Sequence, residues 1–281
     1  MADALRRLAP GARLGYGRGP VKTAALPLAL ALAALAAPAA ADEAACWYEN
    51  GVVVVTAEVA GFVGDYILDT GQAATQLAET QALELGYVEP AVTGEVRLAG
   101  LRLPPRQVQV ADLDVRTGLF PTPIAGVIGA DVLKDHVLDV SFAPCRVRLS
   151  APGRAPRFSG ARLPLAWAEG RPVTLAGAAD GPTALRGPFV VSTGLDAPAR
   201  LSEALAAAPG AEKPAELLSY GVLRPRLAAL SFGDVLVPDL PAGLMRPEPD
   251  AVAGAIGAPV LARWRLRFDF PAGALGLAPA P

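Results

Sequence analysis

The chain has 281 residues, of which 52% are hydrophobic and 19% charged, and its formal net charge is −2 at pH 7. This length suits one large domain or two lobes with modest cores. No basic stripe is present, which argues against a nucleic-acid partner. The chain has a single histidine, His136, which argues against a metal site. No cofactor is predicted.

Residues 1–41 are interpreted as an export signal preceded by an N-terminal extension. Lys22 gives a charged start, residues 23–37 form an apolar run, and small residues precede an expected cleavage before Asp42. The run is short for a bilayer span, so a signal is favoured over a membrane anchor. We expect a periplasmic or secreted protein without a membrane span. Cleavage before Asp42 would remove five basic residues and one acidic residue, so the formal net charge would move from −2 to about −6. Val21 is an alternative start of translation.

The elements that follow are mostly short strands. Residues 51–59 are β-rich, a turn at Gly61 leads into a strand at residues 66–68, and apolar spacing predicts a helix over residues 75–85 that ends at Gly86. Further strands are predicted at residues 96–103, 108–110, 126–129, 138–142 and 145–149.

Proline, glycine and arginine are frequent in residues 151–163, which we interpret as a linker between a first lobe, residues 42–150, and a second lobe, residues 164–281. A second helix is predicted at residues 201–207. Cys46 and Cys145 are the only cysteines and flank the first lobe. In an exported protein such a pair predicts a disulfide, with two free thiols as the alternative.

The two lobes share a repeated motif. Residues 66–71 read Tyr-Ile-Leu-Asp-Thr-Gly, and residues 189–194 read Phe-Val-Val-Ser-Thr-Gly, an offset of 123 between the fourth positions (192 − 69). A later block, Val-Ile-Gly-Ala at 127–130, returns as Ala-Ile-Gly-Ala at 255–258, an offset of 128. Preserved order with a small drift indicates two copies of one unit that differ in loop length.

An apolar pair before Asp-Thr-Gly, a helical stretch and then an Ile-Gly strand resemble the lobe of a retropepsin-like aspartic peptidase. Two such lobes in one chain resemble a bilobal aspartic peptidase over nearly the whole mature sequence. The resemblance implies an all-β fold: two tandem six- to seven-stranded β-barrel lobes with short helices that face each other across a cleft, with Asp69 and Ser192 near its floor.

The resemblance also implies the chemistry. In the family, two carboxylates share a proton and act together as general acid and general base. Asp69 matches one of them, and Ser192 stands where the other is expected. Thr70 and Thr193 match the hydroxyls that bond across the lobe interface. Gly71 and Gly194 permit the close turns.

Two functions stay open. The first is an exported aspartic-type endopeptidase that acts on extended polypeptide through Asp69; the alternative is an inactive pseudopeptidase that binds peptides. Tyr220 and Gly221 are the candidate flap over the site, with an ordinary hairpin turn as the alternative. We expect a monomer whose own lobes pair. The other route to a dyad is a homodimer of first lobes, which would bring two copies of Asp69 together.

Overall fold

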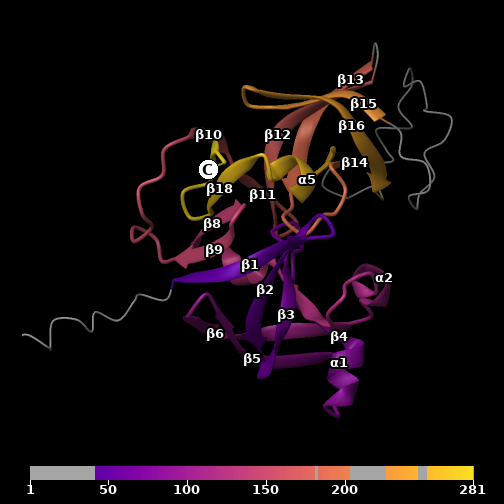
Figure 1. The fold of residues 1–281 in the computed structure, drawn as a ribbon, viewed down its shortest axis with the longest axis vertical. Helices are drawn as coiled ribbons and strands as arrows, with labels where there is room; N and C mark the ends of the chain where they lie inside the picture. Colours follow the sequence, from indigo (N-terminus) through magenta and orange to yellow (C-terminus); the bar gives the residue numbers. More distant parts are fainter. Residues whose placement is uncertain (1–41, 181–182, 203–225, 246–251, 281) are drawn as a thin grey trace, which may run out of the picture. The chain divides into compact units, whose positions relative to one another are not determined.

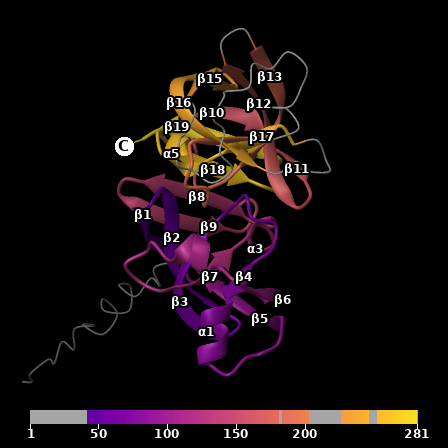
Figure 2. The same cartoon turned by 90° about the vertical axis from the view of Figure 1, so that its right-hand side faces the viewer.

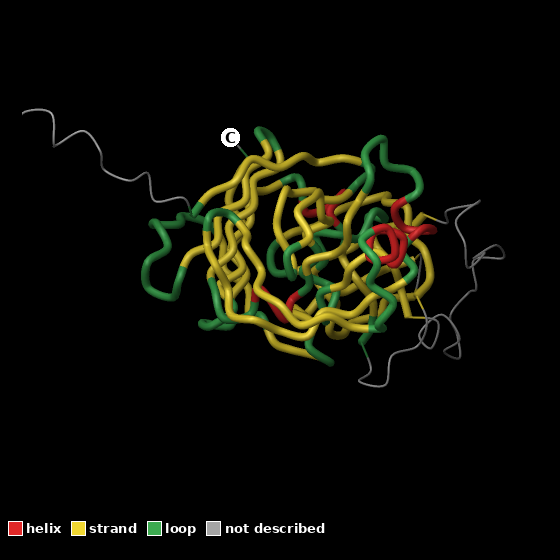
Figure 3. The backbone as a smooth tube through the Cα atoms, turned by 90° about the horizontal axis from the view of Figure 1, so that it is seen from below, coloured by secondary structure: helices red, strands yellow, loops and turns green. Residues whose placement is uncertain are grey.

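The structure is a computed structural model that describes residues 42–180, 183–202, 226–245 and 252–280. Strands dominate this part, and its helices have six residues or fewer (Figure 3). In chain order the first half contains β1 (Glu43–Glu49), β2 (Val52–Val59), β3 (Phe62–Leu68), β4 (Gln76–Ala78), α1 (Glu79–Glu84), β5 (Ala91–Leu98), β6 (Leu101–Ala111), α2 (Asp114–Thr117), β7 (Ile124–Ile128), α3 (Ala130–Leu133), β8 (Val137–Phe142) and β9 (Cys145–Ser150). The second half contains β10 (Ala161–Pro164), β11 (Ala166–Ala168), β12 (Arg171–Asp180), β13 (Thr183–Val191), β14 (Ala199–Ser202), β15 (Arg226–Phe232), β16 (Val235–Met245), β17 (Gly254–Ile256), α5 (Ala258–Leu261), β18 (Trp264–Asp269) and β19 (Ala274–Pro279).

Six strands of the first half close into a barrel. Their hydrogen-bonded order is β2-β3-β7-β4-β6-β5, and β5 pairs back with β2 (Figure 1). Strand β3, which precedes the first motif, lies parallel to β7, with Leu68 opposite Ile128. Alternate apolar side chains such as Val53, Val55 and Tyr66 are buried in the core, as expected for a closed sheet.

The second half repeats this order. Strands β12-β13-β17-β14-β16-β15 form a second barrel that closes from β15 to β12. Strand β13, which precedes the second motif, lies parallel to β17, with Val191 opposite Ile256. The repeat in the sequence is therefore a repeat of structure, and the fold consists of two closed β-barrels.

A further run of strands, β10-β19-β18-β8-β9-β1, joins the two halves in one sheet. Strand β8 of the first half pairs antiparallel with β18 of the second, and Asp139 lies opposite Arg267 in this register. One continuous hydrophobic core extends from the barrels to this sheet, as side chains such as Leu138 and Phe268 show.

Three details differ from the expectations. Residues 75–85 are not one helix, because residues 76–78 form β4, where Leu77 pairs with Val110 of β6, and α1 starts only at Glu79. Residues 201–202 of the second predicted helix belong to β14, and its remainder lies outside the described residues. Residues 161–163, expected in the linker, pair with β19 as strand β10.

Cys46 and Cys145 form a disulfide with Cα atoms 5.0 Å apart. The bond lies where β1 changes partner, since residues 43–45 pair with β9 and residues 46–49 pair with β2. It therefore fastens the strand that passes from the joining sheet into the first barrel.

Candidate functional site

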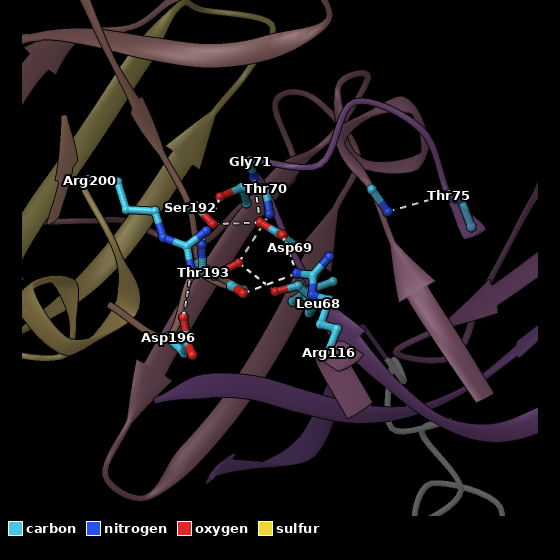
Figure 4. Close-up of polar contacts among 12 residues, drawn as sticks. Leu68, Asp69, Thr70, Gly71, Thr75, Arg116, Ser192, Thr193, Asp196 and Arg200 are labelled. Atoms are coloured by element: carbon cyan, nitrogen blue, oxygen red, sulfur yellow. Dashed lines mark hydrogen bonds and ion pairs between the residues drawn. The ribbon is translucent and has the colours of Figure 1, made fainter. Parts of the chain in front are cut away.

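The two motif turns meet at the ends of the parallel strand pairs. Asp69 N–H donates to the carbonyl of Ile128 at 3.0 Å, and Ser192 N–H donates to the carbonyl of Ile256 at 3.0 Å. These matching bonds direct both first-position side chains to one place, where the Ser192 hydroxyl donates to Asp69 Oδ1 at 2.7 Å (Figure 4). Both residues are buried, with 5% and 4% of their surface exposed. The serine therefore faces the aspartate, which the alignment of the two sequence copies left open.

The threonines form a two-fold symmetric bond network between the turns. Each backbone N–H, of Thr70 and of Thr193, donates to the hydroxyl of the other threonine at 3.2 Å. Each hydroxyl then donates across the interface at 2.6 Å, from Thr70 to the carbonyl of Val191 and from Thr193 to the carbonyl of Leu68. All donors and acceptors of this network are satisfied in a buried position, which fixes the geometry of both turns.

The glycines let the two turns approach closely. A Cβ on Gly71 would lie 2.5 Å from Ser192 Cβ, and a Cβ on Gly194 would lie 2.4 Å from Asp69 Cβ. Any side chain at either position would overlap with the facing motif. The two turns therefore fit closely against each other around Asp69 and Ser192.

An arginine that the sequence did not indicate completes the site. Arg116 Nη2 donates to Asp69 Oδ2 at 2.5 Å and to the carbonyl of Gly194 at 3.0 Å. The other carboxylate oxygen, Oδ1, accepts from Ser192 and, at 2.7 Å, from Gly71 N–H. Both carboxylate oxygens of Asp69 therefore accept hydrogen bonds, and the positive charge of Arg116 balances the negative charge of Asp69 (Figure 4).

The segment that carries Arg116 is held at both ends. Leu113 is buried, and Phe120 packs against the same small hydrophobic cluster. Asn50, in the turn between β1 and β2, donates from its side-chain amide to the carbonyl of Leu119 at 3.1 Å. These contacts place α2 so that Arg116 reaches the carboxylate.

A polar brace supports the first turn but has no counterpart in the second. Thr75 donates its hydroxyl to Asp131 Oδ1 at 2.7 Å and accepts from Gly129 N–H at 3.0 Å. At the positions that the motif offset of 123 and the block offset of 128 assign to Thr75 and Asp131, the second copy has Pro198 and Pro259. The first copy thus has side-chain hydrogen bonds that support its turn, and the two prolines of the second copy cannot form them.

Other candidate residues lie elsewhere. Tyr220 and Gly221 are outside the described residues. Between β4 and β5 the chain forms α1 and a short connection. His136 is partly buried away from the site, and burial lowers its pKa.

Two other features are absent from the described ranges. No group of three or more His, Cys, Asp or Glu side chains there could hold a metal ion. No helix in the same ranges is long and apolar enough to cross a membrane.

No family model matches the sequence, and no curated protein matches it either. Among solved structures, the crystal structure of the aspartic proteinase from Irpex lacteus is similar, with a TM-score of 0.52 and 13% sequence identity. The match covers 85% of this chain and 97% of the proteinase chain. At this identity the similarity concerns the fold alone. The chain therefore has the two-barrel fold of aspartic proteinases.

Proposed function

We propose that this protein is an exported, non-catalytic relative of aspartic peptidases that binds extended polypeptide at the Asp69 site. The observation that supports the loss of catalysis is the set of partners around Asp69: a hydroxyl, a backbone N–H and the guanidinium of Arg116. Peptide hydrolysis by this fold uses two carboxylates that share a proton. A serine cannot supply the second, and the arginine ties the first in an ion pair.

The same site offers groups that suit a polypeptide backbone. The Nε and Nη1 groups of Arg116 have no hydrogen-bond partner among the described residues, and its side chain is 29% exposed. They can donate to a backbone carbonyl of a ligand, and Asp69 Oδ2 has a free lone pair for a backbone N–H. Net neutrality of the Asp69–Arg116 pair suits a neutral amide chain better than a charged small molecule.

Hydrolysis is the second candidate, because Asp69 and the threonine network are intact. In this alternative the protein is a slow aspartic endopeptidase. The offsets of 123 and 128 between the copies also support descent from a duplicated retropepsin-like unit.

The deciding experiment uses the chain from Asp42 onward, incubated with a mixture of unfolded peptides from pH 3 to pH 7 and analysed by mass spectrometry. We expect no cleavage by the wild type and binding of a fluorescent unfolded peptide that weakens in Arg116→Met. We expect the double variant Ser192→Asp/Arg116→Ala to cleave at acidic pH, and more than Ser192→Asp alone, because Arg116 no longer holds Asp69.

Cleavage by the wild type that disappears in Asp69→Asn would establish the endopeptidase instead. Absence of both cleavage and peptide binding, in protein shown to be folded, would refute the binding function.

A further inference from the structure

A second surface, which contains no residue of the Asp69 site, exposes several large apolar side chains. Leu83, Leu85, Tyr87 and Val88, here called the α1–β5 surface, have 52%, 62%, 44% and 79% of their area exposed. They lie at the end of α1 and in the connection to β5, beside the first barrel (Figure 2). Because exposed apolar side chains that gather on one surface commonly mark an interaction site, this segment is a candidate binding surface.

The exposed segment has a defined conformation. The helix α1 is anchored through buried Ala82 and ends at Glu84, and Gly86 follows it with a φ of +79°. Gly86 N–H donates to the carbonyl of Leu83 at 2.9 Å, and Tyr87 N–H donates to the carbonyl of Ala82 at 2.9 Å. The Tyr87 ring contacts Phe62, with ring centres 5.1 Å apart. The apolar side chains are thus presented from an ordered support, which lowers the entropic cost of binding.

The charged side chains on this segment of the chain are all of one sign. Glu79, Glu84 and Glu89 are exposed on the same segment, and neither Glu79 nor Glu89 forms an ion pair with a described residue. Between residues 42 and 96 every charged side chain is Asp or Glu, since no Lys, Arg or His occurs there. The nearest cation along the chain, Arg97, is paired with Glu58 at 3.0 Å.

We propose that the α1–β5 surface docks a polypeptide partner that presents apolar side chains flanked by Lys or Arg. The acidic border attracts a basic partner and steers it to the apolar centre. A second copy of this chain would bring the same acidic border against it, and an anionic membrane would be repelled in the same way. The surface shares no residue with the Asp69 site, so the proposal does not depend on peptide binding there.

The test uses two synthetic amphipathic peptides that are identical except that one carries Lys and the other Glu at every polar position, titrated calorimetrically into the chain from Asp42 onward. We expect the Leu/Lys peptide to bind, with an affinity that falls as salt rises, and the Leu/Glu peptide not to bind. Leu85→Ser/Val88→Ser should weaken binding about tenfold or more, because apolar burial is lost. Glu84→Lys/Glu89→Lys should weaken it and reduce its salt dependence.

The matched control is Val115→Ser/Leu119→Ser, which changes two side chains that are 95% and 85% exposed on the segment of Arg116. This control should bind the Leu/Lys peptide like the wild type. Loss of binding in the control, with retention in Leu85→Ser/Val88→Ser, would assign the peptide to the Asp69 site and overturn the proposal. Equal binding of the Leu/Glu peptide, no binding of the Leu/Lys peptide, or dimerisation that Leu85→Ser/Val88→Ser abolishes would also overturn it.

Discussion

At the scale of residues, the pairing of Asp69 with Arg116 predicts a measurable coupling. The carboxylate is buried, with 8% of its side chain exposed, and the guanidinium is 29% exposed. Arg116→Met leaves the buried carboxylate without its counter-charge. We expect a loss of about 1–3 kcal/mol in the free energy of unfolding, which is less than for a fully buried pair because Arg116 is partly solvated. The double variant Asp69→Asn/Arg116→Met should recover most of the free energy of unfolding that Arg116→Met loses. Urea unfolding in a double-mutant cycle measures this coupling.

The matched control for this cycle is Arg200→Met, which removes an exposed ion pair with Asp196, 43% and 57% exposed. This change should cost no more than about 0.5 kcal/mol. A coupling energy between Asp69 and Arg116 as small as that of the exposed pair would mean that Arg116 does not hold the carboxylate in solution.

His136 predicts a pH dependence of stability. Burial lowers its pKa, the nearby charge of Arg106 lowers it further, and Asp135 raises it. Since an unfolded histidine has a pKa of about 6.5, the unfolded chain takes up a proton below this pH more readily than the folded chain. The contribution of neutral His136 to the stability of the fold is therefore fully present above about pH 6.5. It is lost as the pH falls through the lower pKa of the folded state.

The variant His136→Gln should consequently lose less stability than the wild type between pH 7.5 and pH 5, as measured by urea unfolding at both values. The comparison is made between the two proteins, because carboxylates elsewhere affect both alike. A larger loss in the variant would show that protonation of His136 favours the folded state.

The resemblance placed Asp69 and Ser192 near one floor, and the contact between them was established only by the structure, in which equal positions of the two copies meet. Arg116 could not be predicted in this way. It comes from a connection between strands, where the conformation depends on contacts such as that of Asn50 with Leu119, 69 residues apart. Its only signal in the sequence is its place shortly before the Ile-Gly element.

At the scale of elements, strand pairing overrode a helical pattern. Residues 75–85 have apolar side chains at helical spacing, yet Leu77 and Ala78 are buried in β4 by parallel pairing with β6 and antiparallel pairing with β7. Short apolar runs fit both structures, and the partner strands decide between them. The helical part of the pattern survives only where no strand is available to pair.

The disulfide predicts a stability contribution at this scale. Cys46 and Cys145 are 99 residues apart, so the bond closes a long loop in the unfolded chain. We expect Cys46→Ser/Cys145→Ser to lose about 2–4 kcal/mol in the free energy of unfolding, somewhat less than the chain-entropy limit for such a loop. Urea unfolding of the variant and of the reduced wild type should agree. Equal stability of the oxidised wild type and the variant would show that β1 is held by strand pairing alone.

Over the whole described molecule, equivalent positions in the two copies carry groups of opposite charge that pair with each other. Asp139 and Arg267 are equivalent in the repeat, at an offset of 128, and lie opposite each other between β8 and β18. Arg267 donates from Nε to Asp139 Oδ1 and from Nη2 to Oδ2, both at 2.6 Å. Asp69 and Ser192 show the same division, with the carboxylate in the first copy and the donor in the second.

This division bears on self-association. Two first lobes that paired by the same symmetry would place Asp139 against a second Asp139, and two second lobes would place Arg267 against a second Arg267. Like charges directly opposite in a sheet are destabilising. The asymmetric pair therefore favours association of the two different lobes of one chain over the homodimer of first lobes.

The last prediction tests this pairing through a charge exchange. Arg267→Asp places two carboxylates opposite each other where the partners are 12% and 17% exposed, and should cost about 2–4 kcal/mol in the free energy of unfolding. Asp139→Arg/Arg267→Asp should recover part of this loss. Recovery should stay incomplete, because Arg267 also donates to the carbonyl of Pro156 at 2.7 Å and lies over the Phe158 ring at 4.9 Å. Arg102→Glu, which alters an exposed pair with Glu95, is the control and should have little effect.

Light scattering on the same proteins should give a monomer for the wild type. A wild-type dimer that Asp139→Arg abolishes would mean that Asp139 supports contacts between chains and not the pairing of β8 with β18 within one chain.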